Sequence, residues 1–87
     1  MDNHTRRLIK VIFTSLNLFR NDKIDEKVLL SSVESVSNAL ENNEIKALLD
    51  NFAIKIEESL YLYDVDEGKK FLLEEIKLVT NELSMRM

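Results

Sequence analysis

The sequence contains no cysteine, no proline and no tryptophan, and it has a single glycine, Gly68. Without cysteine the chain can form no disulfide and offers no thiol chemistry, and nothing points to an oxidising compartment, so we expect a cytoplasmic protein. Proline and glycine are the residues that most often mark hairpins and tight turns. Their scarcity favours helices joined by short polar turns.

The chain also lacks an apolar run long enough to cross a bilayer. Its most apolar stretch, LIKVIFTSLNLF, is interrupted by Lys10 and is not followed by a small-residue cleavage site, so we do not expect a secretion signal. A chain of 87 residues that is 45% hydrophobic is too apolar for a disordered tail and fits one domain. We therefore expect a single helical domain over residues 1–87.

Basic side chains outnumber acidic ones only in the N-terminal part of the chain. Residues 1–24 carry five basic and two acidic side chains, whereas residues 25–87 carry seven basic and fourteen acidic ones, and the formal net charge is −4. An acidic protein repels phosphate backbones, so nucleic acid is not the partner we expect. In the alternative interpretation, DNA contact would come from Arg6, Arg7 and Lys10.

Four amphipathic segments predict an all-α protein folded as a small antiparallel four-helix bundle. They span about residues 3–19, residues 26–41 after a cap at Asp25, the stretch from an Asn42 or Asn43 cap to residue 63, and residues 65–84. The third segment has the clearest stripe, and it predicts a buried set of Leu48, Leu49, Phe52 and Ile56. The second is expected to bury Val28, Leu29, Val33, Val36 and Leu40.

The stretch YDVDEGKKFLLEEI, residues 63–76, resembles a calcium loop at first sight because acids alternate before the glycine. An EF-hand loop needs a ligand at its fifth position and glycine at its sixth, but counting from Asp64 places Gly68 fifth and Lys69 sixth. Asp64 and Glu67 instead form a pair typical of a helix cap. We expect Asp64 to cap the fourth helix, and we expect no metal and no other cofactor.

Groups that carry catalysis are few. The one histidine, His4, lies near the terminus, where a solvated side chain is the expectation. No serine has the flanking glycines of a nucleophile elbow, and no glycine-rich loop could cradle a phosphate. An enzyme is therefore not expected, and no catalytic residue is assigned.

Apolar side chains crowd the end of the third segment at Tyr61, Leu62 and Tyr63. Since Tyr63 continues the buried stripe, Tyr61 and Leu62 are expected to be exposed. With Phe13 or Leu18 of the first segment, which is apolar on more than one face, they would form a patch that binds a protein. The alternative is that the first helix is central and is buried on several sides, which places Phe13 and Leu18 in the core.

The segments TRRLIKVIFTSLNLF, DEKVLLSSVESVSNALE, EIKALLDNFAIKIEESL and DEGKKFLLEEIKLVTNEL follow one another over nearly the whole chain. In their order and lengths they resemble the small cytoplasmic immunity proteins that protect producers of pediocin-like (enterocin A type) bacteriocins. The second segment alone is similar to the small helical biofilm and acid-resistance regulators of enterobacteria, which are dimeric connector proteins. The first resemblance implies a bacterial protein that acts by binding another protein.

We therefore expect a non-enzymatic helical module that binds a protein partner stoichiometrically, with bacteriocin immunity as its specific form. A dimeric regulator that contacts DNA or a transcription regulator is the alternative, and an export-chaperone-like adaptor is a third. The sequence leaves monomer and homodimer open.

Overall fold

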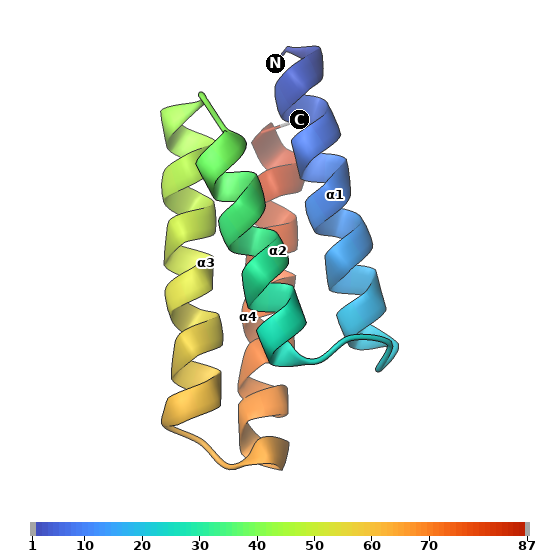
Figure 1. Cartoon of the computed structure of the whole chain (residues 1–87), viewed down its shortest axis with the longest axis vertical. Helices are drawn as coiled ribbons and strands as arrows, with labels where there is room; N and C mark the ends of the chain where they lie inside the picture. Colours follow the sequence, from blue (N-terminus) through green and yellow to red (C-terminus); the bar gives the residue numbers. More distant parts are fainter. Residues whose placement is uncertain (1, 87) are drawn as a thin grey trace.

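A computed structural model describes residues 2–86, so Met1 and Met87 of the expected domain lie outside the described residues. It contains four helices, α1 (Asn3–Arg20), α2 (Glu26–Ala39), α3 (Asn43–Tyr61) and α4 (Val65–Arg86), and these described residues form no β-strand. Figure 1 shows that each helix runs opposite to the one before it. The predicted all-α four-helix bundle is confirmed.

Every helix begins at a polar side chain that accepts a hydrogen bond from a backbone amide three residues further on. This satisfies one of the amide groups that a helix start leaves without an internal partner. The capping oxygens lie 2.7–3.0 Å from those amides, at Asp2, Asp25, Asn42 and Asp64. The caps predicted at Asp25, Asn42 and Asp64 are thus confirmed. Asp2 was not among them; hydrogen bonds from Thr5 lower the pKa of its carboxyl group.

The core consists of apolar side chains from all four helices. In α3, Leu49, Phe52 and Ile56 are buried as predicted, while Leu48 is only half-buried. The prediction that α2 buries Val28 is wrong, because this side chain is exposed. Val28 precedes the buried Leu29 by one residue, a rotation of about 100° around the helix that turns it away from the core.

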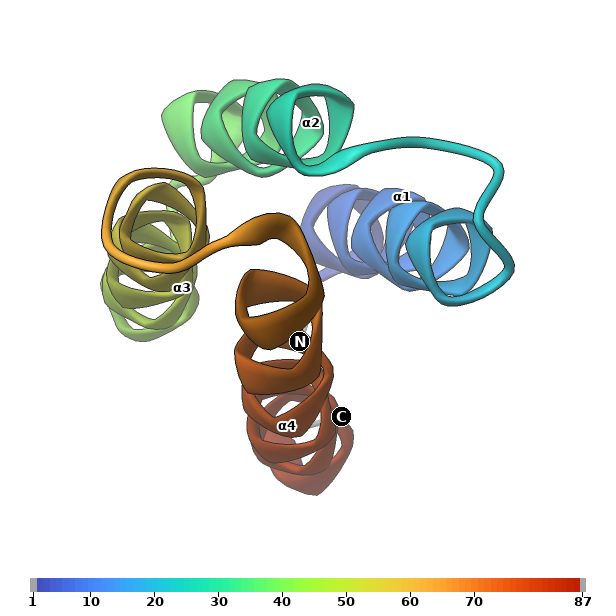
Figure 2. The same cartoon turned by 90° about the horizontal axis from the view of Figure 1, so that it is seen from below.

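Helix α1 is less enclosed than its apolar sequence predicts. Its buried positions follow one face, while Val11 and Leu18 are exposed. The reason is its place in the bundle: α1 packs mainly on α2 and contacts α4 less, so much of its surface has no neighbour (Figure 2). The alternative of a central first helix is therefore wrong for Leu18, whereas Phe13 packs against the core.

Polar contacts join the helices along their lengths. The Ser15 and Ser32 hydroxyls of α1 and α2 lie 2.6 Å apart, and the Ser37 hydroxyl donates to Asp50 of α3. Between α4 and α3, the Arg86 guanidinium lies 2.9 Å from the Glu44 carboxylate. Serine lowers the helix propensity of α2, so these tertiary contacts help to keep the segment helical.

We expect Phe52→Ala to lower the free energy of unfolding by about 3–5 kcal/mol, because it removes a large buried ring and leaves a cavity. That loss approaches the whole stability of a small domain, so thermal melting followed by circular dichroism should show a strongly lowered midpoint. Leu78→Ala is the control, because Leu78 is exposed on α4. A Phe52→Ala protein that melts like the wild type would contradict the assigned core.

Candidate protein-binding site

An apolar cluster is exposed where α3 turns into α4, at the lower end of the molecule in Figure 1. The exposed fractions are 80% for Tyr61, 71% for Leu62, 40% for Tyr63 and 82% for Val65. We call these four residues the apolar tip. The predicted exposure of Tyr61 and Leu62 is confirmed. Folding alone does not account for such exposure, since burying a large apolar side chain is normally favourable.

The tip is a short, well-anchored turn. The amide of Leu62 donates to the Glu58 carbonyl over 2.9 Å and closes α3, and Asp64 caps α4 only two residues later. The ring of Tyr63 stacks on Phe71 of α4 with a centroid distance of 5.0 Å and an interplanar angle of 23°. Tyr63 therefore anchors the turn, and Tyr61 and Leu62 are left to solvent.

Gly68 brings the two helices together beside the tip. A Cβ atom at this position would lie 2.6 Å from the backbone carbonyl oxygen of Ser59, which is closer than such atoms approach in folded proteins. Both residues are buried. The one glycine of the chain thus acts in helix packing, because only a residue without a side chain lets the start of α4 approach the end of α3 this closely.

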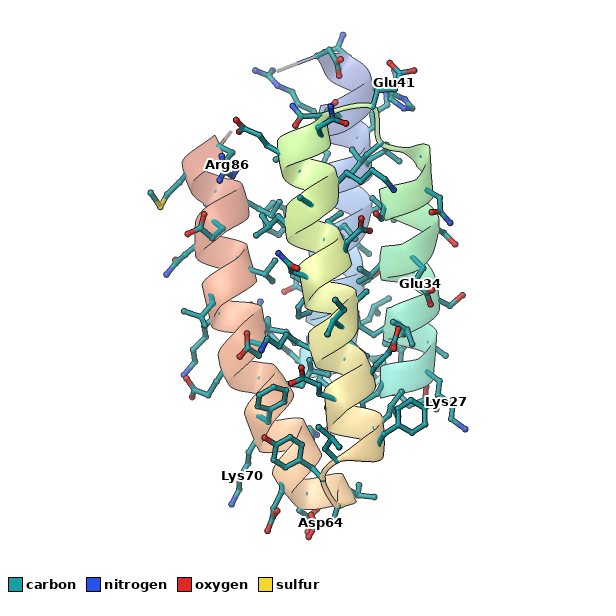
Figure 3. The ribbon with its side chains drawn as sticks, turned by 90° about the vertical axis from the view of Figure 1, so that its left-hand side faces the viewer. Lys27, Glu34, Glu41, Asp64, Lys70 and Arg86 are labelled. Carbon is teal, nitrogen blue, oxygen red and sulfur yellow. The ribbon has the colours of Figure 1, made fainter. Side chains whose placement is uncertain are left out.

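Carboxylates lie beside the apolar tip at the start of α4. Asp64, Asp66 and Glu67 are exposed in the turn and in the first turn of α4, and Figure 3 shows Asp64 at the lower end of the molecule. Acidic side chains stabilise a helix start through its dipole, which explains their position. They also give the tip a negative rim, and this rim favours a partner with basic groups around an apolar surface.

The other predicted partner-binding residues, Phe13 and Leu18, belong to α1. Phe13 is half-buried and packs against the core, whereas Leu18 is exposed on a different face of α1. The end of α1 and the turn between α3 and α4 lie at the same end of the bundle (Figure 1), where Phe19 and Val65 line one pocket and Lys69 pairs with Asp22. Phe13 packs against the core and is therefore less available to such a patch, while the predicted patch of Leu18 with Tyr61 and Leu62 stays a prediction.

The basic residues of the alternative interpretation lie on the first turns of α1. Arg6, Arg7 and Lys10 are all exposed. Arg6 and Lys10 are four residues apart and share a face of the helix, while Arg7 is rotated away from Arg6 by about 100°. His4, also exposed, has its Nε2 atom 3.1 Å from the carbonyl oxygen of Ala39.

Two further features bear on what the chain can bind. Within residues 2–86, no three acidic or histidine side chains converge as a metal ion would need. The carboxylate of Asp64, the first acid of the calcium-like stretch, is engaged by the Glu67 amide at 2.9 Å. None of the helices in this described part has the length and apolar character needed to span a membrane.

Val65 was not predicted from the sequence to belong to the tip, and no role was predicted for Gly68. Val65 is the first residue of α4, at a point where a helix has no preceding turn to cover a side chain. Its position between Asp64 and Asp66 is the local signal that could have marked it as exposed. The role of Gly68 depends on Ser59 and could not be inferred from the surrounding residues.

Compared with models of known protein families, with curated proteins and with solved structures, the chain shows no match. The relationship to bacteriocin immunity proteins that the resemblance implies therefore stays a prediction.

We expect Gly68→Ala to lower the free energy of unfolding by about 1–3 kcal/mol, as overpacked sites do. The sign of this change in the free energy of unfolding is informative, because alanine normally stabilises a helix interior by about 1 kcal/mol relative to glycine. Chemical denaturation measures the change, and Ser84→Ala at an exposed position of α4 is the control. A Gly68→Ala protein more stable than the wild type would show that the helices do not meet closely here.

We expect Asp64→Ala to lose about 1 kcal/mol of stability, because it removes the cap of α4. The loss should be the same with millimolar calcium and with a chelator, measured by thermal melting. A calcium-dependent rise in the melting temperature of the wild type that is absent from Asp64→Ala would overturn the capping assignment.

Proposed function

We propose that this chain is a non-enzymatic helical module that binds a protein partner stoichiometrically through the apolar tip. The observation that carries the proposal is the exposure of Tyr61, Leu62 and Val65 at 80%, 71% and 82% on a turn anchored at both ends. Tyrosine and large apolar side chains concentrate binding energy when a partner buries them. Their removal from water is the driving force for association.

Anchoring of the tip makes this binding more favourable. Tyr63 is held by its stack on Phe71, and the backbone on either side is fixed by the end of α3 and the cap of α4. Little conformational entropy is then lost when the tip is buried, so more of the gain from apolar contact appears as affinity. The acidic rim adds selectivity, since it attracts basic partners and repels acidic ones.

Bacteriocin immunity in the cytoplasm is the specific form of this proposal. Its support is the resemblance in helix order and lengths described above, and it fits a protein that acts by binding and carries out no reaction. A connector that binds a transcription regulator, or an adaptor for export, would use the same kind of exposed tip.

Direct DNA contact is the competing proposal. The exposure of Arg6, Arg7 and Lys10 on α1 favours it. The net charge of −4 and the acidic rim of the tip oppose it, because both repel the phosphate backbone.

We expect the double variant Tyr61→Ser and Leu62→Ser to lose capture of the partner from the native cell while retaining its helix content and melting temperature. The matched control is Leu78→Ser with Met85→Ser, which removes two apolar side chains that are 60% and 81% exposed on α4. The captured protein should then bind the purified wild type with one-to-one stoichiometry in isothermal titration calorimetry.

Equal capture by the tip variant and the wild type would overturn the tip proposal. Binding of duplex DNA near physiological salt, weakened by replacing Arg6, Arg7 and Lys10, would favour the competing class instead.

A further inference from the structure

The side of the bundle between α1 and α4 carries a groove that is separate from the apolar tip. The guanidinium of Arg20 in α1 donates to the Thr80 hydroxyl of α4 over 3.1 Å, which shows which face of α1 is turned toward α4. Arg6 and Phe13 lie on that same face, because they precede Arg20 by fourteen and seven residues, close to whole numbers of helical turns. Positive charge therefore follows the α4 side of α1.

The groove has a volume of about 430 Å³ and is lined by Arg20 of α1 and by Lys70, Leu73, Glu74 and Lys77 of α4. We call these five residues the cationic groove. Its volume lies within the range of about 300–1,000 Å³ that is typical of ligand pockets. It is thus large enough to take several side chains of a bound segment.

Most of the positive charge in the groove is uncompensated. Arg20 donates to Asn17 and Thr80, over 3.1 Å in each case, and both acceptors are neutral. Lys77 pairs with Glu74 at 3.2 Å, whereas Lys70 makes no ion pair within the described range of residues 2–86. Three cations against one carboxylate leave a net charge of +2 in a chain whose net charge is −4.

The floor of the groove is apolar. Leu73, the apolar side chain among the lining residues, is half-buried and packs against the core. An apolar floor between cationic side chains is complementary to an amphipathic helix with apolar residues on one face and carboxylates beside them.

We propose that the cationic groove binds an acidic amphipathic segment of a protein partner. The apolar floor favours a protein segment, because a phosphate backbone has no apolar face to bury there. The acidic side chains beside the apolar tip repel such a segment, whereas the cations of the groove attract it and fix its orientation. This proposal does not rest on the apolar tip.

The probe is a synthetic amphipathic peptide of about 18 residues, built from leucine and glutamate with the apolar residues at helical spacing. The matched peptide has glutamine in place of every glutamate. We expect the glutamate peptide to bind about tenfold more tightly in fluorescence anisotropy, and its affinity to fall as salt is raised from about 0.05 M to about 0.3 M. Amide shifts in NMR spectra should gather at Lys70, Leu73 and Lys77.

A charge reversal with a matched control tests the groove itself. Lys70→Glu should weaken the glutamate peptide about tenfold, whereas Lys27→Glu should leave it unchanged within about twofold. Both lysines are exposed, and Figure 3 shows them on opposite sides of the molecule, on α4 and on α2. Circular dichroism should show the same helix content for both variants.

Equal affinity for the glutamate and glutamine peptides would overturn the proposal, and so would an equal loss of affinity in Lys70→Glu and Lys27→Glu. Amide shifts confined to Tyr61 and Leu62 would place the peptide on the apolar tip instead. Duplex DNA that binds more tightly than the glutamate peptide, and that Lys70→Glu also weakens, would show that the groove binds nucleic acid. Self-association of the wild type that Lys70→Glu abolishes, measured by sedimentation, would assign the groove to a second copy of this chain instead.

Discussion

The contact between Gly68 and the carbonyl oxygen of Ser59 determines how α3 and α4 meet, and the rest of this end of the molecule depends on it. A glycine in a helix costs about 1 kcal/mol relative to alanine, and here the close packing of two helices offsets that cost. Because the helices already touch, the connecting turn is short. A short turn cannot fold back over itself, so Tyr61 and Leu62 have no part of their own chain to cover them.

Two surfaces of opposite character result from this arrangement. The apolar tip has carboxylates beside it at the end of the bundle, while the cationic groove lies on the side of the bundle between α1 and α4. The overall charge of −4 hides this separation, since it averages an acidic end and a basic side. Recognition by such a chain depends on the local potential at each surface more than on its net charge.

Local interactions account for what could be predicted from the sequence. Caps at Asp25, Asn42 and Asp64 involve an amide three residues away, and the burial of Phe52 follows from helical periodicity. Val28 was wrongly placed in the core because it is apolar, although helical periodicity turns it about 100° away from the buried Leu29. Periodicity identifies the apolar face of a helix but not how much of it a neighbour covers, which is why Leu18 of α1 is left exposed. The groove could not be predicted from the sequence because it depends on a contact between distant segments: Arg20 and Thr80 are sixty residues apart in the chain.

The order of the helices in space has a consequence for how the chain folds. α1 packs on α2, α2 on α3 and α3 on α4, so nearly every tertiary contact joins segments that are consecutive in the sequence. Loop closure then costs little entropy at each step, and a topology of this kind is associated with folding in microseconds to milliseconds. The contact of α1 with α4, which joins the two ends of the chain, is the one that requires a long loop to close. The search for the native topology is thus reduced to adding one helix at a time to its predecessor.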